Sequence, residues 1–307
     1  MSNIQIAVVS TSPISISLIH YLSENNQLAG VLMPGALTHE SYQLHEKLVQ
    51  NNVPVCQYQD NQVALEHLDR WQADLGVVFG CGVKISPELS DGLRHSMVNF
   101  HASALPEYRG PQPVYWQIRN GERNTMLTAH RLEESFDTGD IVAQWPIDID
   151  PLETHHLLFG KIATEAMGLV ETLVEQIYTH GELRATPQAS EFKHAAPRVQ
   201  EKDLAINWKE SSALEICNQI RASNPHLGGA RATFGKFQGN VLQATPSGHP
   251  TYDLKPGTVV HVSLSQGLIV ALKDECIRLD IIGDSEGFYD GYRYAELIQM
   301  RAGMELK

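Results

Sequence analysis

The stretch Ile4-Gln5-Ile6-Ala7-Val8-Val9-Ser10 decides how the first half of the chain folds. It is a short and almost unbroken apolar run, and residues 14–24 then place apolar side chains at helical spacing. Such a run predicts a strand buried on both faces, and the alternation of strands with helices predicts a parallel sheet. The pattern continues with strand candidates at 28–34, 53–58, 73–80 and 96–103, and helix candidates at 41–50, 63–71 and 86–93. We therefore predict a Rossmann-like α/β fold, a mostly parallel sheet with helices on both faces.

The second half of the chain has a different texture. Residues 153–180 carry one apolar stripe at helical spacing and predict a long helix that Gly181 ends. A polar, proline-containing segment follows, and after residue 206 short apolar runs are separated by glycine and proline. This punctuation predicts a small β-rich, OB-like barrel. The expected organisation is a catalytic domain at 1–183, a linker at 184–205 and a C-terminal β-rich domain at 206–307.

The composition limits the possible partners. The chain has 307 residues and a formal net charge of -13, and we find no local basic patch that would attract a polyanion. No apolar run approaches the roughly 18 residues needed to span a bilayer, and the N-terminus has no signal-peptide pattern. The four cysteines form no Cys-x-x-Cys pair, so free thiols and no metal site are expected. These features predict a cytoplasmic protein with no membrane partner.

The stretch from Asn99 to Pro113 carries the first chemical signal. Asn99 and His101 lie near the end of a strand candidate and are two residues apart, so a strand would point both side chains to one face. An imidazole beside a carboxamide can offer a proton shuttle and a hydrogen-bond donor to one reacting centre. From spacing alone, however, a packed core histidine and a turn asparagine are the simpler interpretation.

A second stretch, Ser135 to Asp140, contains Asp137 between two strand candidates. By composition it is an ordinary hairpin or loop. A carboxylate beside a histidine would raise the histidine pKa and fix its tautomer. The spacing does not place Asp137 against His101, and the nearby His130 is expected to have a packed structural role.

Together the two stretches resemble the folate-dependent formyltransferase family, which includes methionyl-tRNA, aminoarabinose and glycinamide ribonucleotide formyltransferases. The family pattern is Asn-x-His-x-Ser-Leu-Leu-Pro-x-Tyr/Trp-Arg-Gly, with an Asp-x-Gly motif some thirty residues later. Ala104 departs from it, where leucine is usual, and this bears on the folate pocket. The resemblance covers nearly the whole chain, because the segment 218–225 and the β-rich tail also resemble the larger members. The matching positions are Asn99, His101, Ser103, Leu105, Pro106, Tyr108, Arg109, Gly110, Asp137 and Gly139.

The resemblance implies an enzyme that uses 10-formyltetrahydrofolate as formyl donor and needs no metal. It implies that Asn99 hydrogen-bonds the formyl oxygen, that His101 stabilises the oxyanion and relays a proton, and that Asp137 holds His101. It also implies a pterin site near two loops and a folate-facing wall. The residues concerned are Val83, Lys84, Ile85, Glu133, Glu134, Ser135 and Phe136 for the pterin, and Ser103, Ala104, Leu105 and Pro106 for the wall.

The acceptor is the open question. Methionyl-tRNA formyltransferases carry a basic insertion after the second strand, whereas residues 33–41 here contain neither Lys nor Arg. With the acidic balance, this favours a small primary amine, such as a nucleotide-linked amino sugar, over initiator tRNA as partner. Hydrolysis of formyl-folate and a non-catalytic binding module are the further alternatives, and the intact Asn99, His101 and Asp137 argue against the last.

Overall fold

The structure is a computed structural model that describes residues 3–306. By its internal contacts the chain divides into two compact units. The first comprises Met1–Pro113, Asn124–Asp148 and Phe159–Pro197, and the second comprises Val114–Arg123, Ile149–Leu158 and Arg198–Lys307. The second unit therefore takes two short segments from the middle of the chain. The domain organisation expected from the sequence, with boundaries at 1–183, 184–205 and 206–307, stays a prediction.

The first unit is built on a seven-stranded sheet in the order β3-β2-β1-β4-β5-β6-β7. Its strands β1 to β5 are parallel, and β6 and β7 add on in antiparallel fashion. This confirms the predicted mostly parallel sheet. The strands are β1 (Ile6–Val9), β2 (Leu28–Pro34), β3 (Val55–Tyr58), β4 (Leu75–Phe79), β5 (Met97–His101), β6 (Asn124–Arg131) and β7 (Ile141–Asp148).

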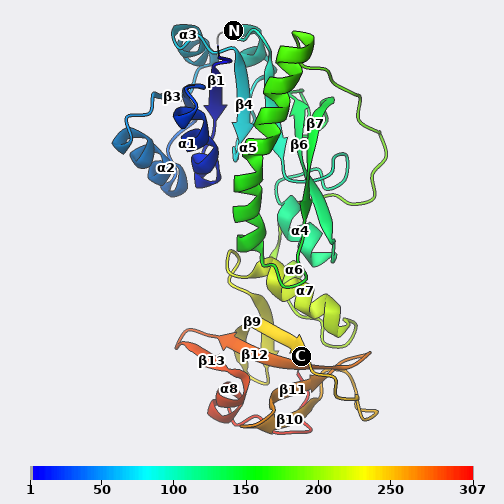
Figure 1. Cartoon of the computed structure of the whole chain (residues 1–307). Coiled ribbons are helices and arrows are strands. Elements are labelled where there is room, and N and C mark those ends of the chain that lie inside the picture. Colours follow the sequence, from blue (N-terminus) through cyan, green and yellow to red (C-terminus); the bar gives the residue numbers. More distant parts are fainter. Residues whose placement is uncertain (1–2, 307) are drawn as a thin grey trace. The chain divides into compact units, whose positions relative to one another are not determined.

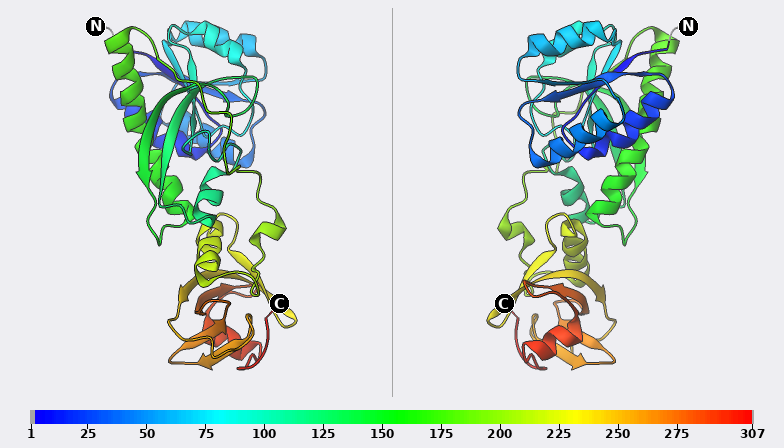
Figure 2. Two further views of the ribbon diagram at one scale, coloured as in Figure 1. Left: turned by 90° about the vertical axis from the view of Figure 1, so that its right-hand side faces the viewer. Right: turned by 90° about the vertical axis from the view of Figure 1, so that its left-hand side faces the viewer.

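Helices cover both faces of this sheet. One face packs against α3 (Asn61–Arg70) and the 3-10 helix η2 (Pro87–Gly92), which forms where a short helix was predicted. The other carries α1 (Ile16–Glu24) and the long helix α5 (His155–His180), and Figures 1 and 2 show α5 and α3 on opposite sides of the strands. The unit also contains η1 (Pro13–Ser15) and α2 (His39–Gln50).

The predicted apolar stripe of α5 is the reason for its position. Leu169 and Leu173 are fully buried, as apolar residues four apart on one helix face should be. On the same helix, Gly168 leaves room for Trp145, whose nearest ring carbons would lie 2.6–2.9 Å from an added Cβ. The Trp145 indole N–H donates to the Glu165 carboxylate at 2.7 Å, which satisfies its polar atom. No helix within residues 3–306 is both long and apolar enough to cross a membrane.

The second unit is an antiparallel sheet with short helices, as predicted for the C-terminal part of the chain. Its strand order is β10-β11-β12-β9-β8, with β13 beside β12. Trp208, Phe234 and Tyr294 are the largest side chains of its core. The elements are α4 (Pro113–Arg119), α6 (Glu201–Leu204), α7 (Ala213–Ser223), β8 (Ala230–Phe234), β9 (Phe237–Pro246), β10 (Val259–Ser263), β11 (Gly267–Ala271), β12 (Cys276–Gly283), β13 (Phe288–Asp290) and α8 (Gly291–Leu297).

Candidate active site

Strand β5 brings the first two candidate residues to the carboxyl-terminal edge of the sheet. Asn99 and His101 share one face of β5, and His101 is its last residue. In the antiparallel pairing of β5 with β6, Asn99 lies opposite His130, so their side chains share that face. The Asn99 Nδ2 atom is 2.9 Å from His130 Nε2. His130 is buried, as a packed residue should be, and it also contacts the candidate cluster through Asn99.

Asp137 reaches this group from the loop between β6 and β7. Its Oδ1 lies 3.4 Å from His101 Nδ1 and 3.7 Å from His130 Nε2. Its Oδ2 accepts the backbone N–H of Gly110 at 3.0 Å. The structure thus brings Asp137 to Asn99 and His101, a contact that spacing in the sequence did not establish.

The loop that carries Asp137 is tightly constrained. Asp137 has a φ of 58°, in the left-handed region that residues with side chains seldom adopt. At Gly139 an added Cβ would lie 2.0 Å from the Arg131 carbonyl oxygen, so this position requires glycine. The Asp-x-Gly spacing is thus a backbone requirement as well as a chemical one, because the close turn aims the carboxylate at the histidines.

The hydrogen bonds of the two imidazoles define their tautomers. His101 Nε2 lies 2.9 Å from the Tyr108 carbonyl and His130 Nδ1 lies 2.8 Å from the Arg131 carbonyl. A carbonyl oxygen only accepts, so each of these ring nitrogens carries the proton. A neutral ring then presents its other nitrogen as a lone pair, His101 toward Asp137 and His130 toward the Asn99 amide. The cluster has more acceptors than donors and can take up one further proton.

The pKa directions agree with this proton deficit. Burial lowers the pKa of His101 below its ordinary value, against the opposing charge of Asp137 and the Tyr108 carbonyl. Burial alone would raise the pKa of Asp137, but the His130 ring, the charge of His101 and the Gly110 N–H together hold that pKa low. At neutral pH the site therefore contains a neutral imidazole against a carboxylate, which is a proton acceptor.

The predicted pterin loops lie next to one another at the same end of the sheet. Lys84, in the loop after β4, forms a 3.0 Å ion pair with Glu134 in the loop before Asp137. Val83 is 45% exposed and Phe136 is 65% exposed, so apolar surface is available at these loops, whereas Ile85 is buried. A flat, uncharged ring system would cover such surface favourably. Glu133 and Ser135 belong to the same exposed loop.

The predicted folate-facing wall is more enclosed. Ser103 and Leu105 are buried, and the Ser103 hydroxyl donates to the Glu107 carbonyl at 2.6 Å. Ala104 and Pro106 are half-buried. Any contact from this stretch would therefore come from Ala104, Pro106 or backbone atoms rather than from the Ser103 hydroxyl.

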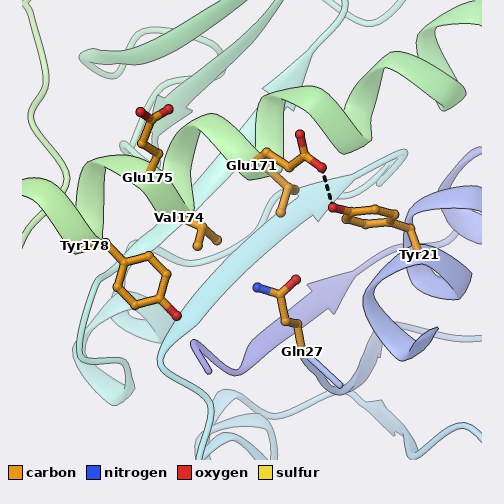
Figure 3. Close-up of a pocket in the computed structure, with 7 residues that line it drawn as sticks. Tyr21, Gln27, Glu171, Val174, Glu175 and Tyr178 are labelled. Atoms are coloured by element: carbon orange, nitrogen blue, oxygen red, sulfur yellow. Dashed lines mark hydrogen bonds between the residues drawn. The ribbon is translucent and has the colours of Figure 1, made fainter. Parts of the chain in front are cut away.

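A separate cavity of about 300 Å³ lies beside α1 and α5 (Figure 3). The Tyr21 hydroxyl donates to Glu171 at its rim, and this hydrogen bond raises the pKa of Tyr21 to about 12. Its lining contains none of the predicted site residues, and it carries no assignment. The lining residues are Tyr21, Gln27, Val170, Glu171, Val174, Glu175 and Tyr178.

The sequence interpretation missed the part played by the segment 185–196. This stretch falls inside the predicted linker, yet it runs along the loop that follows His101. The backbone N–H of Tyr108 donates to the His194 carbonyl at 2.7 Å, and that of Ala196 donates to the Arg109 carbonyl at 2.8 Å. Its polar, proline-containing composition gives no hint of these contacts, which depend on the folded position of the loop.

Two family models match this chain. The formyl transferase model matches residues 35–173, and the model of the formyl transferase C-terminal domain matches residues 198–287. The two matches follow one another in the same order as the parallel-sheet unit and the antiparallel-sheet unit.

Individual relatives carry different names and bound molecules. The chain is 33% identical over 205 residues to methionyl-tRNA formyltransferase of Agathobacter rectalis, covering 64% of this chain and 63% of that one. One similar solved structure is an N-formyltransferase from Helicobacter canadensis in complex with folinic acid and dTDP-3-aminofucose. It gives a TM-score of 0.66 at 20% identity, and the match covers 93% of this chain and 100% of that one. HypX from Aquifex aeolicus, in complex with tetrahydrofolic acid, gives a TM-score of 0.64 at 17% identity, and the match covers 96% of this chain and 47% of that one. With both halves matched, this chain belongs to the formyl transferase family.

Proposed function

We propose that this protein transfers a formyl group from 10-formyltetrahydrofolate to a primary amine. The observation that carries the proposal is the cluster of Asn99, His101 and Asp137, with the carboxylate 3.4 Å from the imidazole. Family membership supports the reaction class, and the exposed Val83 and Phe136 offer apolar surface suited to a pterin ring. The donor supplies a formyl carbon that an amine can attack.

The residues of the cluster divide the work of the reaction. The amine nitrogen bonds to the formyl carbon, the bond from that carbon to the leaving nitrogen breaks, and one proton passes from the first nitrogen to the second. The Asn99 amide nitrogen has two hydrogens, of which one points to His130 and the other can hold the formyl oxygen. His130 thereby sets the orientation of the Asn99 amide.

His101 and Asp137 provide the proton acceptor. The pKa of each is lowered from its ordinary value, so both are unprotonated in the resting site and the pair can receive the proton that the attacking amine loses. Once protonated, His101 keeps its hydrogen bond to the Tyr108 carbonyl and gains charge attraction to Asp137. The positive ring then stabilises the oxyanion through its charge, and the His101–Asp137 pair returns the proton to the leaving nitrogen.

A small amine is the acceptor we favour, with a nucleotide-linked amino sugar as the leading candidate. RNA binding draws on unpaired Lys and Arg side chains, whereas the chain carries a net charge of -13. Two cations at this edge of the sheet are already engaged, because Lys84 pairs with Glu134 and Arg109 donates to Gln188 at 2.6 Å. The turn Gly35–Thr38 between β2 and α2 adds no cation. Initiator tRNA is the alternative, supported by the tRNA-modifying relatives.

The test is a transfer assay with purified protein and 10-formyltetrahydrofolate. Nucleotide-linked amino sugars are compared with methionyl initiator tRNA at physiological salt, and a reaction without acceptor measures hydrolysis. The small-amine proposal is supported if an amino sugar is formylated and kcat/KM for methionyl initiator tRNA is well below about 10⁴ M⁻¹s⁻¹. Efficient formylation of the tRNA would replace the small-amine proposal with the tRNA alternative. Donor consumption at the same rate with and without an acceptor would indicate a hydrolase.

A further inference from the structure

Residues 185–196, which we call the strap, hold the loop that carries the His101 hydrogen-bond partner. Arg109 and Ala195 form a parallel β-bridge, so the strap and the loop run side by side. The Glu107 carboxylate accepts the backbone N–H groups of Lys193 and His194 at 2.9 and 3.0 Å. The Tyr108 ring also stacks on His194, with centroids 5.2 Å apart and planes 12° apart.

Gln188 is the strap residue that reaches both motif loops. Its Oε1 accepts two hydrogen bonds from the Arg109 guanidinium, at 2.6 and 3.2 Å. Its Nε2 donates to the carbonyl of Asp137 at 3.0 Å and to that of Gly139 at 2.6 Å. One side-chain amide therefore links the loop after β5 to the loop between β6 and β7, using both of its hydrogens and its oxygen.

The backbone conformation of Asp137 makes this support relevant to its position. Its left-handed φ of 58° is uncommon for a residue with a side chain, although Asp adopts it more readily than most, and hydrogen bonds to the turn help to hold it. The Gln188 amide binds the Asp137 carbonyl, and the Gly110 N–H binds its carboxylate. Both contacts come from polypeptide that the strap holds in place. A rotation of the Asp137 peptide would carry the carboxylate away from His101.

We propose that Gln188 is a positioning residue, which keeps the Asp137 carboxylate against His101 by donating to the Asp137 and Gly139 carbonyls. The inference rests on the proposed function for its kinetic consequence, because it assumes that Asp137 acts through His101. The positioning itself is a property of the resting protein.

The amide chemistry of Gln188 lets its two roles be separated. Gln188→Glu keeps the shape and still accepts from Arg109, but a carboxylate has no hydrogen to donate to the two carbonyls. Gln188→Ala removes both roles. Ser190→Glu, on an exposed residue of the same strap, is the matched control for added negative charge.

We expect Gln188→Glu to lower kcat roughly 10- to 100-fold, the scale of a misplaced reacting group, with KM for both substrates within about threefold. The ion pair with Arg109 should offset part of the stability lost with the two hydrogen bonds. Ser190→Glu should keep kcat within about twofold of the wild type, far from the effect of a misplaced group. If Gln188→Glu keeps normal kcat, or if kcat falls only in proportion to stability across the variants, the positioning role is overturned.

A second measurement does not depend on any activity. NMR titration of histidine-labelled protein follows the pKa of His101, which the Asp137 charge raises. In Gln188→Ala the released carboxylate should move away, so the pKa of His101 should fall further. An unchanged His101 pKa in Gln188→Ala would contradict the positioning role even if no acceptor amine is found. If the His101 pKa falls in the variant but the wild type shows no formyl transfer, the positioning role stands and the proposed function is refuted.

Discussion

Two clusters of buried polar side chains, one in each unit, differ in how their hydrogen bonds are balanced. In the parallel-sheet unit, ring nitrogens of His101 and His130 face the Asp137 carboxylate. In the antiparallel-sheet unit, buried Arg221 on α7 donates to the Asn218 side chain at 3.0 Å and to the Glu153 carbonyl at 3.0 Å. Both clusters are buried and polar, so burial alone does not mark an active site.

The balance between hydrogen-bond donors and acceptors distinguishes the two clusters. The Arg221 guanidinium also donates to the Ile118 carbonyl at 3.4 Å, so each of these hydrogen bonds runs from an N–H to an oxygen. No proton has to move in this cluster. The cluster around Asp137 instead has more lone pairs than hydrogens. A cluster short of a proton can exchange one during a reaction, whereas a satisfied cluster fixes the positions of the segments it joins.

The largest expected effect concerns the proton-deficient cluster. His101→Ala or Asp137→Asn should lower turnover roughly 10²-fold or more, because each removes part of the proton acceptor. Folate binding should persist, since neither change touches the exposed apolar surface at Val83 and Phe136. Steady-state kinetics and equilibrium folate binding measure the two quantities. Near-normal turnover in His101→Ala would refute the proposed mechanism.

Breaking the satisfied cluster should have the opposite profile. Arg221→Met removes the guanidinium hydrogen bonds to the Asn218 side chain and to the Glu153 and Ile118 carbonyls, so we expect about 2–4 kcal/mol of lost stability. Turnover of the folded protein should stay within about threefold, because no proton-transfer group is removed. Urea unfolding and kinetics below the transition measure both. Strong loss of turnover with unchanged stability would show that the two clusters do not differ as argued.

Acid should act on a second polar group of the antiparallel-sheet unit, the stacked pair of His155 and His226. In the antiparallel-sheet unit, His155 stacks on His226 with centroids 5.0 Å apart, and burial, with the charges of His226 and His156, lowers the pKa of His155 to about 4. Between pH 6.5 and 4 the unfolded chain binds a proton at this residue and the folded protein does not, so stability falls as the pH falls. The loss should be roughly 1–3 kcal/mol, at 1.36 kcal/mol per pKa unit.

His155→Phe should remove this part of the acid sensitivity, because a phenyl ring can stack but cannot bind a proton. The melting temperature, measured from pH 7 to 4.5, should fall less steeply in the variant than in the wild type. The contribution of His101, whose pKa is also lowered, remains in both proteins. Parallel pH curves would show that His155 does not take part.

The smallest expected effect is at His130. His130→Leu removes the acceptor that holds one hydrogen of the Asn99 amide, so the amide loses its fixed orientation and turnover should fall about 3- to 10-fold. His130→Gln, whose oxygen can accept that hydrogen, should recover part of the loss. Equal turnover in both variants would mean that the hydrogen bond to Asn99 does not orient the amide.

Several features of this protein follow from its sequence alone. Continuous apolar runs that alternate with helical spacing predict the parallel sheet, because a strand covered on both faces must be apolar throughout. The two-residue spacing of Asn99 and His101 places them on one face for the same geometric reason. The family resemblance links these residues to Asp137. Each of these inferences uses residues within one element or one motif.

Only the tertiary structure decided which distant groups meet. Asn99 faces His130 because of the pairing register of β5 with β6, and no local pattern fixes that register. Asp137 faces His101 because a tight left-handed turn aims its carboxylate. Gln188 lies 51 residues beyond Asp137, in a segment whose composition predicts a linker. Sequence periodicity records which face of an element is apolar, whereas contacts between loops depend on where each loop lies after folding.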